Sequence, residues 1–291
     1  MKYLSLIKQP KVICLIYLIL LTIGATISRS INQGNILFHI IFNFFILLSL
    51  CTYIPWLISF FNTNSKSNKL SIIDSNIITL ILFLILDPSN NFIITILIAS
   101  LVTISRMFIR KNQLPIFNPS AFGIAMTAIF IQLINIFGLN ILLPFVSWWG
   151  VSFSPRFVFI DKLSIAIFLT IPFGIYLAYK LRKLVIFFLA LVLSFLLLKL
   201  ANEFSLIHNT SLIYIFLEGT FLFAILIMLT EPKSSPIKRH EQIIYAISFC
   251  IFWIMFTLLK TNFELIYSII LSNAIYFLLK EIYSYKKRNK F

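Results

Sequence analysis

The sequence predicts an all-α integral membrane protein of about ten transmembrane helices, arranged as two inverted five-helix repeats. Three observations predict this fold: an apolar composition, ten apolar segments near membrane-spanning length, and two acid-bearing segments that match at a fixed offset. Hydrophobic residues make up 60% of the 291 residues and charged residues 11%, against about 45–50% and about 25% in soluble domains. A bilayer accommodates that much apolar area, whereas a soluble fold of this length does not.

Ten apolar segments, punctuated by Pro, Gly, Asn and Lys, are the predicted spans. Most approach the roughly 20 residues that cross about 30 Å of hydrocarbon. They cover residues 12–28, 36–60, 71–86, 92–109, 119–138, 163–179, 184–200, 211–230, 242–259 and 264–283. The first is too long for the apolar core of a signal peptide and lacks a small-residue cleavage site, so we expect an uncleaved span. Between the fifth and sixth, the Trp- and Pro-containing segment 139–160 is expected to be an interfacial or re-entrant loop, with its tryptophans at headgroup depth.

The net charge of +15 is distributed unevenly between the loops on the two sides of the membrane. With the N-terminus inside, 19 of the 24 Lys and Arg residues fall in predicted cytoplasmic regions and 5 in outer loops. The positive-inside rule therefore predicts a multi-pass protein of the bacterial cytoplasmic membrane with both termini in the cytoplasm. Because the basic residues occur in short runs between spans, no continuous basic face is available for a nucleic-acid partner.

Common catalytic and metal-binding patterns are missing from the sequence. Cys14, Cys51 and Cys250 lie in apolar segments without a CxxC pair, and the three histidines are scattered. The seven glycines form no phosphate-binding loop, and no nucleophile elbow is present. We therefore expect no metal site and no self-contained catalytic site.

The third and eighth spans share an arrangement of acidic residues. Asp74 precedes an acid–proline pair at Asp87 by 13 residues, and Glu218 precedes another at Glu231 by 13 residues. Between their flanking acids both segments are short for a span. These acids are either functional or structural. An acid–proline pair also simply ends a helix, and Asp74 lies near an interface, where a solvated helix cap is an alternative. Glu218 lies about two turns inside a span, where an ionisable group is costly and functional by default.

The two acidic patterns lie 144 residues apart, and the same offset relates Asn118 to Asn262. The offset divides a single transmembrane domain, residues 1–291, into repeat 1 at about 1–144 and repeat 2 at about 145–291. Five spans per repeat reverse the second repeat across the bilayer. Short segments at equivalent positions of inverted repeats indicate a central transport site, so we expect the matching acids to meet there.

The fifth span begins in the stretch RMFIRKNQLPIFNPSAFG, residues 106–123. Asn118 is a good N-cap and Pro119 fits the first helical position. Three basic residues precede them: Arg106, Arg110 and Lys111. Such a helix start suits an anionic group such as a flavin phosphate. It also suits a tightly packed, capped helix beside the basic residues of a cytoplasmic loop. The chemistry alone favours this second interpretation.

The run IRKNQLPIFNPSAFG resembles the Arg-rich Phe-Asn-Pro-Ala-Ala-Phe-Gly turn of the NqrB/RnfD family, membrane subunits of sodium-pumping NADH:quinone reductase and of Rnf electron-transport complexes. A second stretch, FLFAILIMLTEPKSSP, resembles that family's Met-x-Thr-Asp-Pro-x-Thr-x-Pro segment, with Glu in place of Asp. This second motif comprises Thr230, Glu231, Pro232, Lys233, Ser235 and Pro236. The similarity covers about residues 70–285 and is nearest the short, UnbU-like members associated with enediyne biosynthesis.

The resemblance implies a fold like that of urea and ammonium channels, a bound flavin, redox partner subunits, and electron transfer coupled to cation movement. It implies a cofactor site at the first motif, comprising Arg106, Arg110, Lys111, Asn118, Pro119, Phe122 and Gly123. Respiratory members carry FMN on a threonine downstream of the Asn-Pro turn, whereas the corresponding SWWGVSFSP has none. Covalent FMN is therefore not expected, and FMN or riboflavin would bind non-covalently.

Two functions remain open from the sequence. The first is a membrane subunit of an NqrB/RnfD-like electron-transport complex, whose partners supply the electrons because this chain has no dinucleotide-binding fold. The alternative is a channel or carrier for a small solute or cation, which the inverted repeat and paired acids favour. An assembly scaffold without a cofactor is a weaker third possibility.

Overall fold

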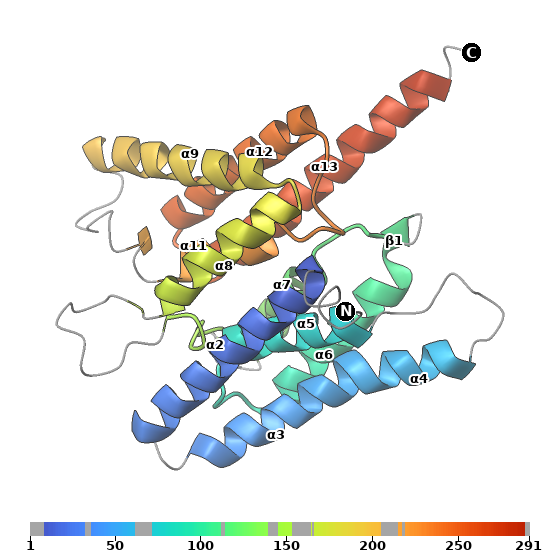
Figure 1. Ribbon diagram of the computed structural model, residues 1–291, viewed down its shortest axis with the longest axis vertical. Coiled ribbons are helices and arrows are strands. Elements are labelled where there is room, and N and C mark those ends of the chain that lie inside the picture. Colours follow the sequence, from blue (N-terminus) through green and yellow to red (C-terminus); the bar gives the residue numbers. More distant parts are fainter. Residues whose placement is uncertain are drawn as a thin grey trace, which may run out of the picture.

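The computed structural model describes residues 9–32, 36–61, 72–111, 114–138, 145–152, 164, 166–204, 215–216 and 219–288, and these are mostly helical (Figure 1). The elements of the first part are α2 (Pro10–Asn32), α3 (Leu37–Leu48), the π-helix η2 (Ser49–Tyr53), α4 (Ile54–Phe61), α5 (Ile72–Ile85), α6 (Phe92–Phe108), β1 (Arg110–Lys111), β2 (Leu114–Pro115) and α7 (Pro119–Ile136). Those of the second part are α8 (Ala166–Lys180), α9 (Leu184–Glu203), α11 (Thr220–Phe223), the π-helix η3 (Ala224–Met228), α12 (Arg239–Leu258) and α13 (Glu264–Arg288).

A helical stretch lies within each of the ten predicted spans. Among the described residues, six helical stretches are long and apolar enough to cross a membrane, and α5, α6 and α8 are shorter apolar helices. Their outer faces expose large apolar side chains, such as those of Phe38, Phe108 and Ile136, as expected for contact with lipid. The prediction of an all-α, multi-pass membrane protein that contacts a bilayer is therefore confirmed, while the number of ten crossings stays a prediction.

The helices pack in two groups that follow the order of the chain. In Figure 1 the blue to teal helices α2 to α6 lie below, and the yellow to red helices α8 to α13 lie above. Within the first group α2 and α3 pack on α5, and α6 packs on α7. Within the second group α8 and α9 pack on η3, and α12 packs on α13. Contacts of α2 with α8, and of α7 with α13, join the groups.

The short helix α5 and the α11–η3 segment run in opposite directions. Residues 145–152 lie beside the carboxyl end of α5, where Leu86 bridges to Val146. The same segment meets the start of α11, because the Val151 carbonyl lies where a Cβ on Gly219 would collide with it. Gly219 adopts a φ of 92°, which a residue with a side chain rarely adopts. The opposite ends of the two elements lie together at the cavity described below.

Trp149 does not lie at a headgroup surface, contrary to the expectation from sequence. Its side chain is 6% exposed, and its Nε1 donates a hydrogen bond to the Phe83 carbonyl at 2.7 Å. The neighbouring Gly150 N–H donates to the Leu84 carbonyl at 2.9 Å. The described part of the loop is therefore packed into the protein against the end of α5, as a re-entrant segment would be.

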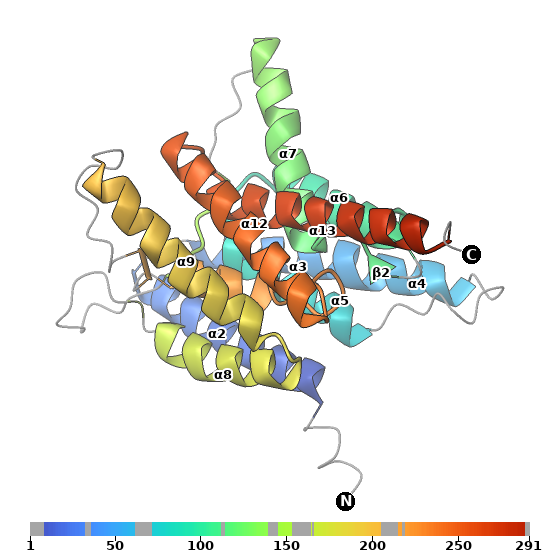
Figure 2. The same cartoon turned by 90° about the horizontal axis from the view of Figure 1, so that it is seen from above.

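Helix α7 begins at the centre of the molecule, and its carboxyl end projects from the other helices (Figure 2). Its first turns approach α6 closely through Gly123. A Cβ at this position would lie 2.3 Å from a Val102 methyl carbon and 2.9 Å from the Ile98 carbonyl oxygen. Gly123 is thus a packing residue between α6 and α7, the role that small residues take between membrane helices.

Candidate functional site

A cavity of about 100 Å³ lies where the two groups of helices meet. Its wall is formed by the first turns of α2, α5 and α7, the ends of α6 and α8, and the turn that follows η3. Side chains of α5 and η3 such as Ile77, Ile81 and Ile227 make much of it apolar. The charged residues that line it are Lys11, Asp74, Arg106, Arg110, Glu231 and Lys233.

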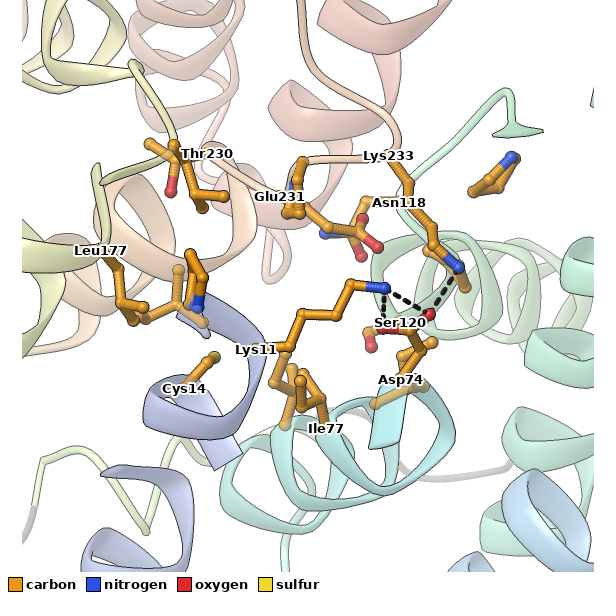
Figure 3. A pocket seen from close by; sticks show the side chains of 18 of the residues that line it. Lys11, Cys14, Asp74, Ile77, Asn118, Ser120, Leu177, Thr230, Glu231 and Lys233 are labelled. Atoms are coloured by element: carbon orange, nitrogen blue, oxygen red, sulfur yellow. Dashed lines mark hydrogen bonds and ion pairs between the residues drawn. The ribbon is translucent and has the colours of Figure 1, made fainter. Parts of the chain in front are cut away.

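Asp74, in the first turn of α5, joins two parts of this wall. Lys11 Nζ from α2 lies 2.9 Å from Asp74 Oδ1, and Lys233 Nζ from the turn after η3 lies 2.7 Å from Oδ2 (Figure 3). The Asp74 side chain is 12% exposed, whereas both lysines reach further into solvent. A mostly buried carboxylate requires such partners, because an unpaired charge there would be strongly unfavourable.

Glu231 brings a second carboxyl group into the same space from the turn after η3 (Figure 3). Its Oε2 accepts a hydrogen bond of 2.8 Å from Ser234 Oγ. Burial raises the pKa of Glu231 from 4.5 to about 7, although the Ser234 hydrogen bond and the charges of Lys233 and Arg106 oppose this shift. Glu231 therefore gains and loses a proton near neutral pH, which an ordinary surface glutamate does not.

Arg106 is 6% exposed at the end of α6, and its guanidinium group is engaged by the protein. Nη1 donates to the Cys51 carbonyl at 3.1 Å, and Nη2 donates to Ser75 Oγ at 3.0 Å. Pro55 has no N–H to supply the α-helical hydrogen bond to the Cys51 carbonyl, so a donor from another helix is needed there. Arg106 thus ties the π-helical region of one helix to the start of α5 while its positive charge remains at the cavity.

Asn118 links the two sequence motifs in space. Its Oδ1 accepts the Ala121 N–H at 3.1 Å, which confirms the predicted N-cap of α7. Its Nδ2 donates to the Met228 carbonyl at 3.0 Å. That carbonyl lies four residues before Pro232, which has no N–H to donate, and its other donor is the Glu231 N–H at 3.4 Å. The first motif therefore fills a hydrogen-bonding position that the proline of the second motif vacates.

Lys183 is a structural residue of the site region that the sequence analysis missed. It is 1% exposed between α8 and α9, and its Nζ donates to the Ser235 carbonyl at 2.7 Å, to Ser235 Oγ at 2.9 Å and to the Pro236 carbonyl. Ser235 in turn donates from N and Oγ to the Glu231 carbonyl. In sequence Lys183 is one of several basic residues of the predicted loop 180–183, and no pattern distinguishes it.

Replacing Lys183 with methionine is expected to lower the free energy of unfolding by about 2–4 kcal/mol, because the buried Ser235 carbonyl loses its donor and the Pro236 carbonyl keeps only Gln242 Nε2 at 3.4 Å. Thermal unfolding of the purified protein in one detergent measures the effect. Lys180→Met is the matched control: Lys180 is exposed and contacts only the Tyr176 ring in the described residues, so this variant should change stability by less than about 0.5 kcal/mol. Equal effects of the two substitutions would contradict the assigned role of Lys183.

The other predicted site residues are divided between the cavity and its surroundings. Pro119, Thr230, Pro232 and Lys233 line the cavity, whereas Ser235 and Pro236 hold its turn through Lys183. Lys111 lies apart from the cavity and pairs with Glu281 of α13. Phe122 stacks on Phe117.

Of the four predicted transport acids, Asp74 and Glu231 line the cavity. Asp87 lies at the other end of α5, where its Oδ1 accepts the Ser89 N–H at 2.8 Å and caps a turn. Glu218 lies outside the described residues. The acids that meet are therefore one from each pattern but not the equivalent pair, because antiparallel elements bring the start of one beside the end of the other.

No known family model and no curated protein matches this chain.

The cavity does not fit the flavin that the sequence resemblance implies. A cavity of about 150 Å³ binds a single benzene ring, and this one, at about 100 Å³, is too small for a three-ring flavin. Lys111 points away, and both terminal nitrogens of Arg106 already have protein acceptors. No metal-binding cluster of His, Cys, Asp or Glu occurs among the residues that the structure describes.

Proposed function

We propose that this protein is a membrane carrier or channel that moves a small solute or ion through the cavity between its two halves, with Glu231 as the proton-responsive group. The observation that carries the proposal is the cavity itself, which two short antiparallel elements and an acid from each half line. Central sites between short or interrupted segments are typical of transporters built from inverted repeats.

Reciprocal hydrogen bonds support the two inverted repeats on which this proposal rests. The Leu84 carbonyl, four residues before Pro88, accepts the Gly150 N–H from the second half. The Met228 carbonyl, four residues before Pro232, accepts Asn118 Nδ2 from the first half. Leu84 and Met228 are related by the same 144-residue offset as the acid–proline pairs. Each half therefore donates to the equivalent carbonyl of the other, although the two donors, Asn118 Nδ2 and the Gly150 N–H, do not occupy equivalent positions.

The contacts between helices follow the same relation. The offset maps α7 onto α13 and α2 onto residues 154–176, which overlap α8 in part, and both of these helix pairs touch across the halves. With both termini in the cytoplasm, the ends of α2, α5, α6 and α8 that line the cavity are cytoplasmic ends. The proposed state therefore opens inward, with Lys11 and Lys233 held together across the cavity by Asp74.

Flux measurements in proteoliposomes test this proposal. The purified full chain is reconstituted, and uptake of urea, ammonium, Na⁺, K⁺, chloride and nitrate is compared with uptake by protein-free vesicles at about pH 6 and about pH 8. We expect saturable flux of at least one probe that changes with pH in wild type. Glu231→Gln should remove that pH dependence, because the amide cannot titrate.

Glu203→Gln is the matched control, since Glu203 is exposed at the end of α9 and pairs only loosely with Lys199 at 3.8 Å. It should behave as wild type. Absence of flux for every probe in correctly folded wild-type protein would overturn the proposal.

A second candidate function is a membrane subunit of an NqrB/RnfD-like electron-transport complex, in which redox partners drive the ion movement. The observation that favours it is that the two motifs behind the resemblance, 110 residues apart in sequence, meet at Asn118 and the Met228 carbonyl. A non-covalent flavin would require the cavity to widen. Visible absorption of the protein purified with its co-expressed neighbours is the test, and colourless preparations would count against this candidate.

A further inference from the structure

The charges around the cavity are not balanced. Four basic side chains line it, from Lys11, Lys233, Arg106 and Arg110, against the two carboxyl groups of Asp74 and Glu231. The balance is +2 with Glu231 ionised and +3 with Glu231 protonated. In a confined, largely apolar space such an excess attracts anions and repels cations.

The oxygen atoms of the cavity are also poorly arranged for a cation. Both oxygens of Asp74 already bind lysine ammonium groups, Lys11 at 2.9 Å and Lys233 at 2.7 Å. Glu231 Oε2 accepts from Ser234. Hard cations require several oxygen ligands free of competing positive charge, and this wall offers at most one such carboxylate.

Arg110, in contrast, has a free charge in the part of the chain that the structure describes. It lies in β1, where its backbone pairs with Pro115 of β2, and no ion pair of its side chain occurs among the described residues. Its position at the cavity wall therefore provides a guanidinium group, a planar donor well suited to an oxyanion.

The size of the cavity limits the anion. A water molecule needs about 10–15 Å³ of such volume, so about 100 Å³ accommodates an anion of a few heavy atoms with some water. Chloride and nitrate meet this limit. Gluconate and sugar phosphates do not.

We propose that the solute of the central cavity is a small monovalent anion, held near Arg110 and Lys233 and accompanied by a proton on Glu231. This inference rests on the proposed transport function and specifies its substrate class. Protonation of Glu231 removes the carboxylate that repels the anion, so anion and proton bind together. One anion and one proton then cross without net charge.

Several ionisable groups share the environment of Glu231 and act on its protonation. They are Lys233, Arg106, Asp74, Lys183, Cys14 and Tyr245, together with Lys11 and Arg110 at the cavity wall. The basic groups among them outnumber the single neighbouring carboxylate of Asp74. Burial raises the pKa of Glu231 to about 7 and lowers that of Lys183 to about 8, so the Glu231→Gln variant is needed to assign a pH dependence to Glu231.

Anion-driven proton uptake tests the inference. Wild-type proteoliposomes carrying an internal pH dye receive an inward gradient of chloride or nitrate, with gluconate as the oversized control. We expect internal acidification with chloride and nitrate only. Chloride affinity, measured by thermal shift in detergent at constant ionic strength, should weaken roughly tenfold from about pH 6 to about pH 8, as expected when one proton with pKa about 7 must bind.

Three variants separate the roles. Glu231→Gln should bind chloride with the same affinity at both pH values and move no protons. Arg110→Gln should weaken chloride binding at least tenfold, whereas Lys111→Gln, at the neighbouring residue paired with Glu281 outside the cavity, should leave it unchanged. Flux of Na⁺ or K⁺ without anion flux would overturn this inference and leave the proposed transport function standing. Absence of all flux would overturn both, and equal effects of gluconate and chloride would refute the binding site.

Discussion

Replacing Asp74 with asparagine is expected to lower the free energy of unfolding by about 2–4 kcal/mol and to abolish transport. The substitution removes the shared partner of Lys11 and Lys233, which lie 2.9 Å and 2.7 Å from its two oxygens. Two ammonium groups then lie beside Arg106 without the carboxylate that paired both of them, and of the acids that line the cavity only Glu231 remains. This loss of stability is smaller than for a fully buried ion pair, because both lysines are partly exposed and solvent screens them.

Asp87→Asn provides the matched control for Asp74→Asn. Asp87 belongs to the same helix and the same sequence pattern, but it caps a turn at the opposite end of α5. Its substitution should lower stability by about 1 kcal/mol or less. Thermal unfolding and proteoliposome flux measure both variants. If Asp74→Asn were as mild as Asp87→Asn, the ion-pair bridge would not be what holds this part of the cavity together.

The stability of the wild-type protein is expected to fall as pH rises from about 4.5 to about 7. The pKa of Glu231 is raised in the folded protein from 4.5 to about 7, so in this range the folded state binds more protons than the unfolded state. Stability then decreases with pH and levels off above about 7, with a total of about 1–3 kcal/mol from this group. Glu231→Gln should remove this decrease and be more stable than wild type above about pH 7.

Unfolding in denaturant at several pH values measures that contribution. Other carboxyl groups titrate in the same range, so the relevant quantity is the difference between wild type and Glu231→Gln at each pH. Glu203→Gln, at an exposed position, should run parallel to wild type. A difference that stayed constant with pH would show that Glu231 has an ordinary pKa.

Helix positions and caps were predictable from the sequence because they depend on local properties. Apolar runs of membrane length, and an Asn-Pro pair at the start of α7, determine their own structure. The ends of α5 and η3 were predictable for the same reason, since Pro88 and Pro232 end helices. The sequence predicted a site between the halves, where equivalent acids would meet, but the lining of this cavity was not predictable because it comes from helices distant in sequence.

Other features depend on tertiary contacts that no local pattern reports. Lys183 resembles every other positive-inside lysine until the turn at Ser235 folds over it. Lys111 is adjacent to Arg110 in sequence, yet Arg110 lines the cavity whereas Lys111 pairs with Glu281 of α13 outside it. Trp149 is buried rather than interfacial because the backbone at Phe83 offers an acceptor. In each case the partner is distant in sequence, so composition and spacing do not reveal it.

The carbonyls of Leu84 and Met228, each four residues before a proline, restrict how the two halves of this molecule can move. The donors to Leu84 and Met228 come from opposite halves, and away from water a bare carbonyl costs several kcal/mol. A motion that pulls the halves apart as rigid blocks would break both bonds, leaving the Leu84 carbonyl without a donor and the Met228 carbonyl with only the Glu231 N–H at 3.4 Å. Opening to alternate sides of the bilayer therefore has the lowest free-energy cost as a hinge rotation about these two hydrogen bonds, which keeps both of them intact.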